Sequence, residues 1–416
     1  MKAPDDRRRK LDREFDIIVW GASGFTGRLV AEHLYTTYGT DETLRWAMAG
    51  RDLGKLEGVR NELGADRIPI LTGDSHDPAS LRTIAARTRV VCTTVGPYLK
   101  YGEQMIAACA QAGTDYCDLT GETLFIHKMI DRYQADAKRS GARIFNSCGF
   151  DSIPSDLGTL FMQQQFNARY GHYAGEIKCR VKHIKGALSG GTVDSMLNII
   201  DAAKSDPAVR RIISNPYALN PSGDQQGQGS KDQTGAVFDE DLGAWTAPFI
   251  MAGINTRIVR RSNAIMDYPW VRDFRYSEAM LTTAGLWGRV TAVLTSLGLK
   301  TFVLAASVNA SRHLMSKLFL PKPGEGPDAI SRRDGFFVLK LLGKDDGGNM
   351  LWGEVSGDRD PGYGSTSRML GETAVCMARD LTDDIAGGFW TPASILGSAL
   401  TERLGKNAGV EFRLTG

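Results

Sequence analysis

The chain has 416 residues, with 50 Lys and Arg against 48 Asp and Glu. The near-cancelling charges exclude a global field that would recruit nucleic acid, so we expect no nucleic-acid partner. The length predicts two domains, each with a sizeable core. Residues 1–14 lack the apolar stretch of a signal peptide, which predicts a solvated N-terminal tail and a cytoplasmic protein.

The six cysteines show neither a CxxC pair nor the spacing of a metal site. In a reducing compartment most of them should be small buried hydrophobic residues, Cys148 included, because it has no histidine near it in sequence. We therefore expect no disulfide framework and no metal.

Residues 15–155 alternate short apolar runs with amphipathic helical segments. In the first helical segment Phe25, Leu29, Val30, His33 and Leu34 share one face. Strands separated by helices predict an α/β fold, a Rossmann-type doubly wound parallel sheet. The candidate strands are FDIIVW (15–20), RWAMA (45–49), IPIL (68–71), RVVCTTV (89–95), DYCDL (115–119) and RIFNS (143–147).

Residues 156–360 predict a second domain of α+β type. EIKCRVK (176–182) alternates polar and apolar residues, as expected of an antiparallel strand with one wet face. GFFVLKLLG (335–343) and NMLWGEVSG (349–357) predict a hairpin, and residues 218–240 a long flexible loop. Residues 361–416 form an apolar C-terminal helical segment that should pack on the first domain or the domain interface.

Residues 280–308 are unusually apolar, but Arg289 and Lys300 leave only ten uncharged residues between them. About 20 would be needed to cross a membrane, so we do not expect a full span. Two interpretations stay open. The segment forms a pair of buried or interface helices, or it forms a hydrophobic lid or surface that docks on lipid or on a partner.

Three glycines in VWGASGFTGRLV (19–30) stand between a predicted strand and a predicted helix. The first glycine permits a tight turn, the second a close approach of the backbone to a pyrophosphate, and the third close packing of helix on strand. Exposed amides at the helix start favour an anion. The turn therefore predicts a dinucleotide site formed by Gly21, Ala22, Ser23, Gly24, Phe25, Thr26 and Gly27.

The end of the second predicted strand distinguishes the two nicotinamide cofactors. Arg51 stands where an acidic residue would bind the ribose hydroxyls of NAD, and a guanidinium can pair with a 2′-phosphate. We therefore predict NADP(H), with Arg28 as a candidate second contact, although the neighbouring Asp52 weakens the preference.

Two further loops follow predicted strands and complete the expected cofactor site. Asp74 stands where such folds often hold the adenine. Val95, Gly96 and Pro97 should border the nicotinamide ribose, since ligands lie beyond the carboxyl ends of parallel strands.

The candidate catalytic residues are Tyr98, Glu122 and Asp151, from three loops expected near the nicotinamide. Tyr98 could give a proton to an enolate or simply pack over the cofactor, and Lys100 and Tyr101 lie close by. Glu122 either serves the site or caps the helix that begins at residue 123. Asp156 is more typical of a first-turn helix acid. SGGT (189–192) is either an anion site or an ordinary helix start.

The motifs GASGFTGR, AGR, TTVGPYLKYG, DYCDLTGE and CGFDSIPSD, in order over residues 21–156, resemble the saccharopine dehydrogenase-like oxidoreductase family. More narrowly, the chain is similar to the trans-acting enoyl reductases of mycobacterial lipid synthesis. DPGYGSTSRMLGETA and GGFWTPASILGSAL in the tail extend the resemblance over most of the chain.

This resemblance implies an NADP-binding Rossmann domain, a second domain over the substrate and C-terminal helices that return to the first domain. It also implies reduction by NADPH of an enoyl C=C bond in an apolar lipid or polyketide-type substrate held on a partner synthase. The alternatives are a saccharopine-type imine or amino-acid dehydrogenase and a lipid-associated nucleotide-binding scaffold without turnover. Peripheral membrane or synthase contact through residues 280–308 and a homodimer are left open.

Overall fold

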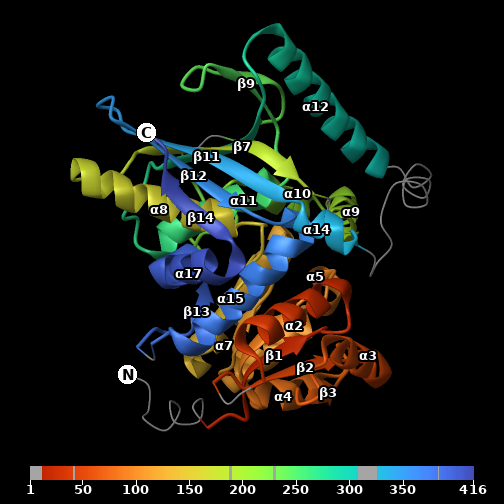
Figure 1. Ribbon diagram of the computed structural model, residues 1–416. Helices are drawn as coiled ribbons and strands as arrows, with labels where there is room; N and C mark the ends of the chain where they lie inside the picture. The colour runs from red at the N-terminus through yellow and green to blue at the C-terminus, as the bar shows by residue number, and fades with distance from the viewer. Residues whose placement is uncertain (1–11, 41–42, 187–189, 228–230, 308–325, 383) are drawn as a thin grey trace.

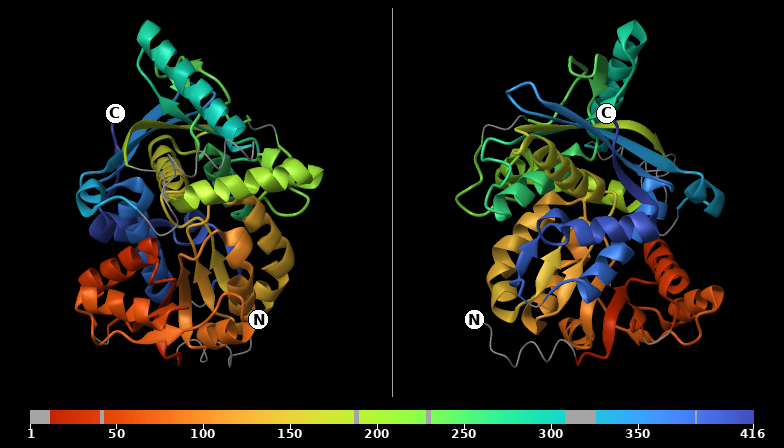
Figure 2. Two further views of the ribbon diagram at one scale, coloured as in Figure 1. Left: turned by 90° about the vertical axis from the view of Figure 1, so that its right-hand side faces the viewer. Right: turned by 60° about the vertical axis from the view of Figure 1, so that its left-hand side comes forward.

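Two seven-stranded sheets form the frame of the molecule, with a helical layer between them (Figures 1 and 2). The computed structural model describes residues 12–40, 43–186, 190–227, 231–307, 326–382 and 384–416. One hydrophobic core runs through the described parts of both domains, from β1 (Phe15–Trp20) to β14 (Val410–Leu414).

The first sheet is entirely parallel, as the alternating sequence pattern predicts. Its strand order is β13-β6-β5-β4-β1-β2-β3, so the order reverses between β1 and β4. Ligands bind at such a reversal, beyond the carboxyl ends of the strands. The strands besides β1 are β2 (Trp46–Gly50), β3 (Ile70–Thr72), β4 (Thr88–Thr93), β5 (Asp115–Cys117), β6 (Arg143–Phe145) and β13 (Gly388–Trp390).

Helices cover both faces of this sheet, which explains why most residues of its central strands are buried. One face carries α2, α3 and α15, and the other carries α4, α6 and α7. Asp52 and Asp77 begin α3 and α4 by accepting hydrogen bonds from first-turn amides. The helices are α2 (Phe25–Tyr38), α3 (Leu53–Leu63), α4 (Pro78–Ala86), α5 (Tyr98–Tyr101), α6 (Glu103–Ala112), α7 (Thr123–Ser140) and α15 (Thr366–Arg379).

The six strands predicted for the first domain are confirmed to within a few residues, but the seventh is not among them. β13 comes from the C-terminal segment and pairs with β6 in parallel register. The prediction that residues 361–416 are only helical is therefore wrong. The same segment also gives β14 to the second sheet.

The second sheet is mixed, with strand order β14-β12-β11-β7-β10-β9-β8. The predicted hairpin is confirmed as β11 and β12, which pair antiparallel. The strand predicted at 176–182 exists as β7, but it is central, antiparallel to β11 and parallel to β10. These strands are β7 (Glu176–Lys185), β8 (Val237–Asp239), β9 (Ala244–Ala247), β10 (Arg275–Leu281), β11 (Phe336–Lys344) and β12 (Met350–Gly357).

Helices α8 and α11 cover the inner face of the second sheet, and the other helices of this half lie around them. Asp156 is a first-turn acid of α8, as predicted. The end of the loop predicted at 218–240 forms β8 instead. These elements are α8 (Ile153–Tyr170), α9 (Gly190–Ser205), α10 (Pro207–Ser214), α11 (Ala252–Ile265), α12 (Gly285–Ala306), α14 (Ala329–Arg333), α16 (Pro392–Ile395), α17 (Gly397–Arg403), η1 (Pro361–Ser365) and η2 (Leu404–Ala408).

The C-terminal segment returns to the first domain, as expected. Helix α15 packs along α2. There Glu372, fully buried, accepts hydrogen bonds from Tyr38 and Asn407 and lies 2.8 Å from the Nε2 atom of His33. This contact ties the last helices to the first one.

The structure of the apolar segment 280–308 differs from the first of the two interpretations, a pair of buried or interface helices. After the last residues of β10 it forms one helix, α12, which projects from the second domain and is mostly exposed (Figures 1 and 2). By length and composition this helix alone, among the described residues, could cross a membrane, which is weak evidence for a span.

All six cysteines are buried, and none of them forms a disulfide with another described residue. Burial raises the pKa of the Cys148 thiol well above its usual range, which suits packing and not nucleophilic chemistry.

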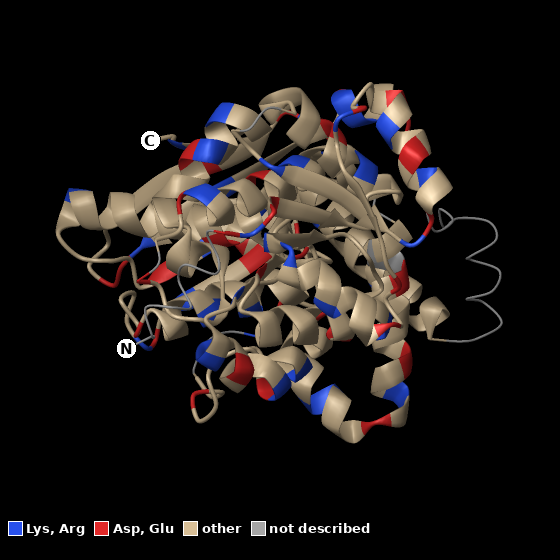
Figure 3. Cartoon of the chain, turned by 90° about the horizontal axis from the view of Figure 1, so that it is seen from below, with Lys and Arg blue, Asp and Glu red and all other residues tan. Residues whose placement is uncertain are grey.

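Basic and acidic residues are interspersed over the helices seen from below (Figure 3).

Candidate cofactor and substrate site

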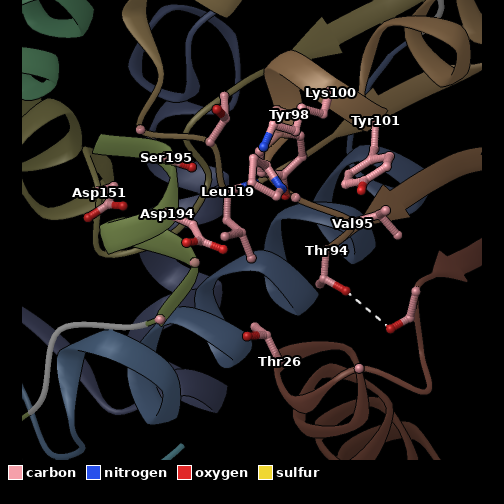
Figure 4. Close-up of a pocket in the computed structure, with 18 of the residues that line it drawn as sticks. Thr26, Thr94, Val95, Tyr98, Lys100, Tyr101, Leu119, Asp151, Asp194 and Ser195 are labelled. Carbon is pink, nitrogen blue, oxygen red and sulfur yellow. Dashed lines mark hydrogen bonds between the residues drawn. The ribbon is translucent and has the colours of Figure 1, made fainter. Parts of the chain in front are cut away.

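A cavity of about 850 Å³ lies between the carboxyl ends of the first sheet and the second domain. Residues Trp20, Gly50 and Leu119, at or after the ends of β1, β2 and β5, form one wall. Residues from α9 and α11 form the other. Figure 4 shows Asp151, Asp194 and Ser195 across the cavity from Thr94 and Tyr101. Two domains thus enclose a single site.

The glycine turn has the steric form that its sequence predicts. Gly21 has φ of +88°, and a Cβ atom there would lie 2.6 Å from the side chain of Val95. A Cβ atom on Gly27 would lie 2.1 Å from the carbonyl oxygen of Gly21. Only glycine fits either position, so the turn is tight and the helix packs directly on the strand.

The start of α2 is open to an anion. Gly24, Phe25 and Thr26 line the cavity, and no side chain among the described residues caps the first amides of this helix. Amides at a helix start have no partner within the helix and carry partial positive charge. The residues present therefore fit a dinucleotide diphosphate. Ser23 also lines the cavity, whereas Ala22 and Gly27 are buried behind it.

Arg51 lies at the cavity edge directly after β2. Its side chain is exposed and makes no hydrogen bond or ion pair with the residues that the structure describes. Asp52 is otherwise engaged, since its carboxylate accepts a hydrogen bond from the amide of Lys55 at 3.1 Å. Arg28 lies 2.9 Å from Glu62 and outside the cavity lining, so the expectation that it provides a second phosphate contact is not supported.

The two other predicted cofactor loops reach the same cavity. Asp74 lines it and is held by its own turn, in which its carboxylate accepts from the amide of His76 at 2.9 Å. Val95, Gly96 and Pro97 line it next to the glycine turn. The hydroxyl of Thr94 donates to the carbonyl oxygen of Gly21 at 3.3 Å, which fixes the two loops to each other.

Tyr98 borders the cavity, but its hydroxyl is used within the protein. The hydroxyl donates to the carbonyl oxygen of Thr93 at 3.1 Å and accepts from the amide of Leu119 at 3.4 Å. Burial raises the pKa of this phenol well above its ordinary value. The geometry therefore favours the packing alternative, in which Tyr98 holds together the loops that follow β4 and β5.

Glu122 lies behind the cavity wall and is fully buried. Its carboxylate accepts from the amides of Tyr98 and Leu99, both at 2.9 Å, and from the hydroxyl of Ser195 at 2.6 Å. It therefore caps α5, because its side chain points to the first amides of α5 and not to those of the helix that begins at Thr123. The bond to Ser195 joins the first domain to α9.

Asp151 is the predicted catalytic residue that faces the cavity with its carboxyl group uncommitted. It is half-buried and makes no hydrogen bond or ion pair with the described residues. Burial raises its pKa to about 7. A carboxylic acid that keeps its proton near neutral pH and touches a cavity is suited to general acid chemistry.

The structure adds cavity residues that the sequence did not single out. Asp194, Ser195, Met196 and Ile199 come from α9, and Met251 and Ile254 from α11 or the residue before it. The sequence signal for the first group is SGGT, which leaves open an anion site or an ordinary helix start. Gly190 and Gly191 of that motif line the cavity, whereas Ser189 lies outside the described residues.

The arginines of RIVRRSN (257–263) are largely occupied. Arg257 lines the cavity, but its guanidinium forms an ion pair with Asp232 and donates to the carbonyl oxygen of Ile213 at 3.1 Å. Arg260 and Arg261 are buried and donate to backbone carbonyls outside the cavity. The cluster supports the packing of α11 and does not form a carboxylate clamp.

The parallel sheet, the glycine turn at its strand reversal and the enclosed cavity define a nucleotide-dependent oxidoreductase. The chain belongs to the trans-acting enoyl reductases, and its residues 17–145 match the saccharopine dehydrogenase NADP-binding domain.

The saccharopine dehydrogenase NADP-binding domain family matches residues 17–145. A relative in Mycobacterium tuberculosis, provisionally named a trans-acting enoyl reductase, is 42% identical over 97% of this chain and 98% of its own. The trans-acting enoyl reductase of Mycobacterium bovis is 37% identical over the same shares. The yeast saccharopine dehydrogenase structure (L-Glu forming, Saccharomyces cerevisiae) superposes with a TM-score of 0.53 at 13% identity, over 97% of this chain and all of that one, and shows the fold alone.

Proposed function

We propose that the protein uses NADPH to reduce the enoyl C=C bond of an apolar, carrier-bound lipid or polyketide-type substrate. The observation that carries this proposal is that the open helix start of α2 and the uncommitted acid Asp151 line one cavity. A hydride carrier and a proton source on opposite walls are what the reduction of a double bond requires.

The preference for NADPH rests on Arg51. It is the exposed cation at the end of β2, where the adenosine ribose of a dinucleotide is read, and no described residue neutralises it. Asp52, the residue that weakens the argument in the sequence, is committed to the start of α3. A free guanidinium suits a 2′-phosphate.

The protein supplies a position and a proton. The glycine turn and Arg51 would hold NADPH, which would supply a hydride to the enoyl group. The carboxyl group of Asp151 then gives its proton to the α-carbon and becomes a carboxylate, which takes up a new proton from solvent. Glu122 positions α5 and α9, and the apolar wall keeps water away from the reacting carbons.

The substrate half of the cavity favours an apolar chain over an amino acid. Met196, Ile199, Ile250, Met251 and Ile254 line it. Among the described residues of this half, Arg257 is the only arginine in the lining, and Asp232 neutralises it. A dicarboxylic amino-acid substrate would need free arginines, so the imine dehydrogenase alternative has little support.

Assays of NADPH oxidation with the purified full-length chain test the proposal. We expect turnover with long-chain enoyl thioesters, fastest when a carrier protein presents them, and none with a 2-oxo acid plus lysine. Turnover of the amino-acid pair alone would establish the alternative dehydrogenase. Binding of NADPH without turnover of either substrate would favour the scaffold.

A further inference from the structure

Helix α12 presents the most concentrated apolar surface among the described residues. Eight of their 18 exposed large hydrophobic side chains belong to this one helix. Trp287 is 79% exposed, Leu286 72% and Leu304 69%. A soluble domain rarely leaves so many large apolar side chains together in water unless the patch meets another surface.

Seven of these eight residues fall on one face of the helix, and Val303 lies outside it. Leu286, Val290, Leu294, Leu297 and Leu304 follow helical spacing, so the apolar stripe runs almost the whole length of α12. The opposite stripe is buried and consists of small residues, Gly288, Ala292 and Ser296. It lies toward β9. The helix thus uses its small side chains to attach to the protein and leaves its large ones outward.

The charges of α12 are all of one sign. Arg289 and Lys300 are eleven residues apart and share the border between the buried and the apolar face, and the helix contains no Asp or Glu. Arg289 also stacks over the ring of Trp245 at 5.4 Å. An apolar face with cations along its edge complements a membrane surface that carries anionic headgroups.

The hairpin next to α12 also carries exposed apolar side chains. Phe238 of β8 is exposed, and its ring meets that of Trp245 at 5.6 Å. Val237 beside it is exposed as well. Exposed apolar residues are thus spread over a helix and a hairpin, which suits a lipid surface better than a narrow groove for a peptide.

Helix α12 is also joined to the cover of the cavity. Ala306, at its end, packs on Leu197 of α9, with Ile200 beside them. Helix α9 lines the cavity through Asp194 and Ser195. The helix with the exposed apolar face therefore ends against the element that closes the substrate site (Figures 1 and 2).

We propose that α12 lies in the plane of an anionic lipid surface, with its apolar face inserted at the level of the headgroups and acyl chains. A helix of 22 residues is about 33 Å long and could cross a bilayer, but Arg289 and Lys300 would then lie within the hydrocarbon. In the plane of the surface both cations reach phosphates while the leucines are buried. The location places the cavity cover next to the lipid phase.

Flotation of the full-length protein with vesicles tests this proposal. We expect binding to mixed phosphatidylcholine and phosphatidylglycerol vesicles and weaker binding to phosphatidylcholine alone. The double variant Leu294→Glu/Leu297→Glu should reduce binding by more than about tenfold, since two charges enter the apolar face. Ile330→Glu on α14 is the matched control, because Ile330 and Leu294 are both 63% exposed, and it should bind as the wild type does.

Two further variants distinguish insertion from adsorption. Lys300→Gln should weaken binding about fivefold on anionic vesicles and leave binding to neutral vesicles unchanged. Brominated lipids should quench tryptophan fluorescence in the wild type, and Trp287→Phe should remove most of that quenching.

The proposal is overturned if the wild type does not float with either kind of vesicle. It is also overturned if the protein is a dimer that the α12 double variant dissociates, because a second copy would then cover the apolar face. Vesicle binding is measured without substrate, so its failure is separable from a failure of the proposed reduction.

Discussion

In the proposed reaction Asp151 is the proton donor, because none of the described residues forms a hydrogen bond or ion pair with its carboxyl group. The neighbouring Asp156 is fully buried, whereas Asp151 is half-buried, and the pKa of Asp156 is also raised to about 7. Its carboxylate, however, accepts from Ser262 and from the amide of Ala393 at 2.8 Å, so it joins three segments. The two acids share a loop-to-helix stretch but serve different purposes.

We predict that Asp151→Asn lowers kcat by roughly 10²–10⁴-fold without changing the Kd for NADPH. Burial places the wild-type pKa at about 7, so the protonated form persists below that pH. The wild-type rate should therefore be level below pH 7 and fall tenfold per pH unit above it. A pH profile of kcat measures both effects.

Asp156→Asn is the control for this variant. It should lower the thermal stability and leave the position of the pH profile unchanged, since Asp156 does not line the cavity. A wild-type profile that stayed flat through pH 9 would remove Asp151 as the proton donor.

Arg51 gives a prediction about the cofactor. Arg51→Ala should weaken NADPH binding by roughly 10–100-fold, the value of a charge-assisted contact, and leave NADH nearly unchanged. Arg28→Ala is the matched control, because Arg28 is paired with Glu62 outside the cavity. Fluorescence titration with both nucleotides measures the two affinities. An equal loss of affinity for NADPH and NADH would contradict a 2′-phosphate contact.

The cofactor half of the site was readable from sequence because its determinants are local. A strand, three glycines and a helix are consecutive, so their geometry follows from neighbours. The substrate half was not readable in the same way. Asp194 and Ser195 reach the cavity only because α9 lies across it, and Glu122 bonds to Ser195 over 73 positions of sequence. Nothing in their own surroundings indicates that contact.

At the scale of elements, the meeting of β1 and α2 depends on one glycine. We predict that Gly27→Ala abolishes nucleotide binding, because its Cβ atom would lie 2.1 Å from the carbonyl oxygen of Gly21. The backbone on both sides is fixed, so the turn must open. Calorimetric titration with NADPH measures the loss.

Gly58→Ala, in the middle of α3, is the counterpart of this change. No atom lies within 4 Å of the Cβ position there, so alanine should raise stability by about 0.5–1 kcal/mol through helix propensity. If the Gly27→Ala variant bound NADPH normally, close packing of α2 on β1 would not be required for nucleotide binding.

The predictability of an element follows its length and its partners. β1 and β4 are six residues each, mostly buried and flanked by helical segments, so their pattern is clear. β13 has three residues, and its partner β6 lies far away in the sequence, in the first domain. The same limit applies to α12, since composition shows that it is apolar and only tertiary structure shows which face is covered.

At the scale of the molecule, the C-terminal segment holds both halves together. β13 extends the first sheet, β14 extends the second, and α15 packs on the first sheet and along α2. The buried pair of Asp115 and Arg143 adds to this, since Arg143 also donates to the carbonyl oxygen of Thr382 at 3.0 Å. Both sheets therefore depend on the last 50 or so residues of the chain.

Substitution of Glu372 tests how far the fold depends on the C-terminal segment. We predict that Glu372→Ala lowers the free energy of unfolding by about 3–5 kcal/mol, because Tyr38, His33 and Asn407 lose their common acceptor in a buried place. Glu32→Ala, at the exposed position of α2 directly before His33, should change the free energy of unfolding by less than about 0.5 kcal/mol. If urea denaturation of the two variants gave similar costs, the C-terminal segment would not be fastened through Glu372, and the two sheets would have to be held mainly by the apolar core that they share.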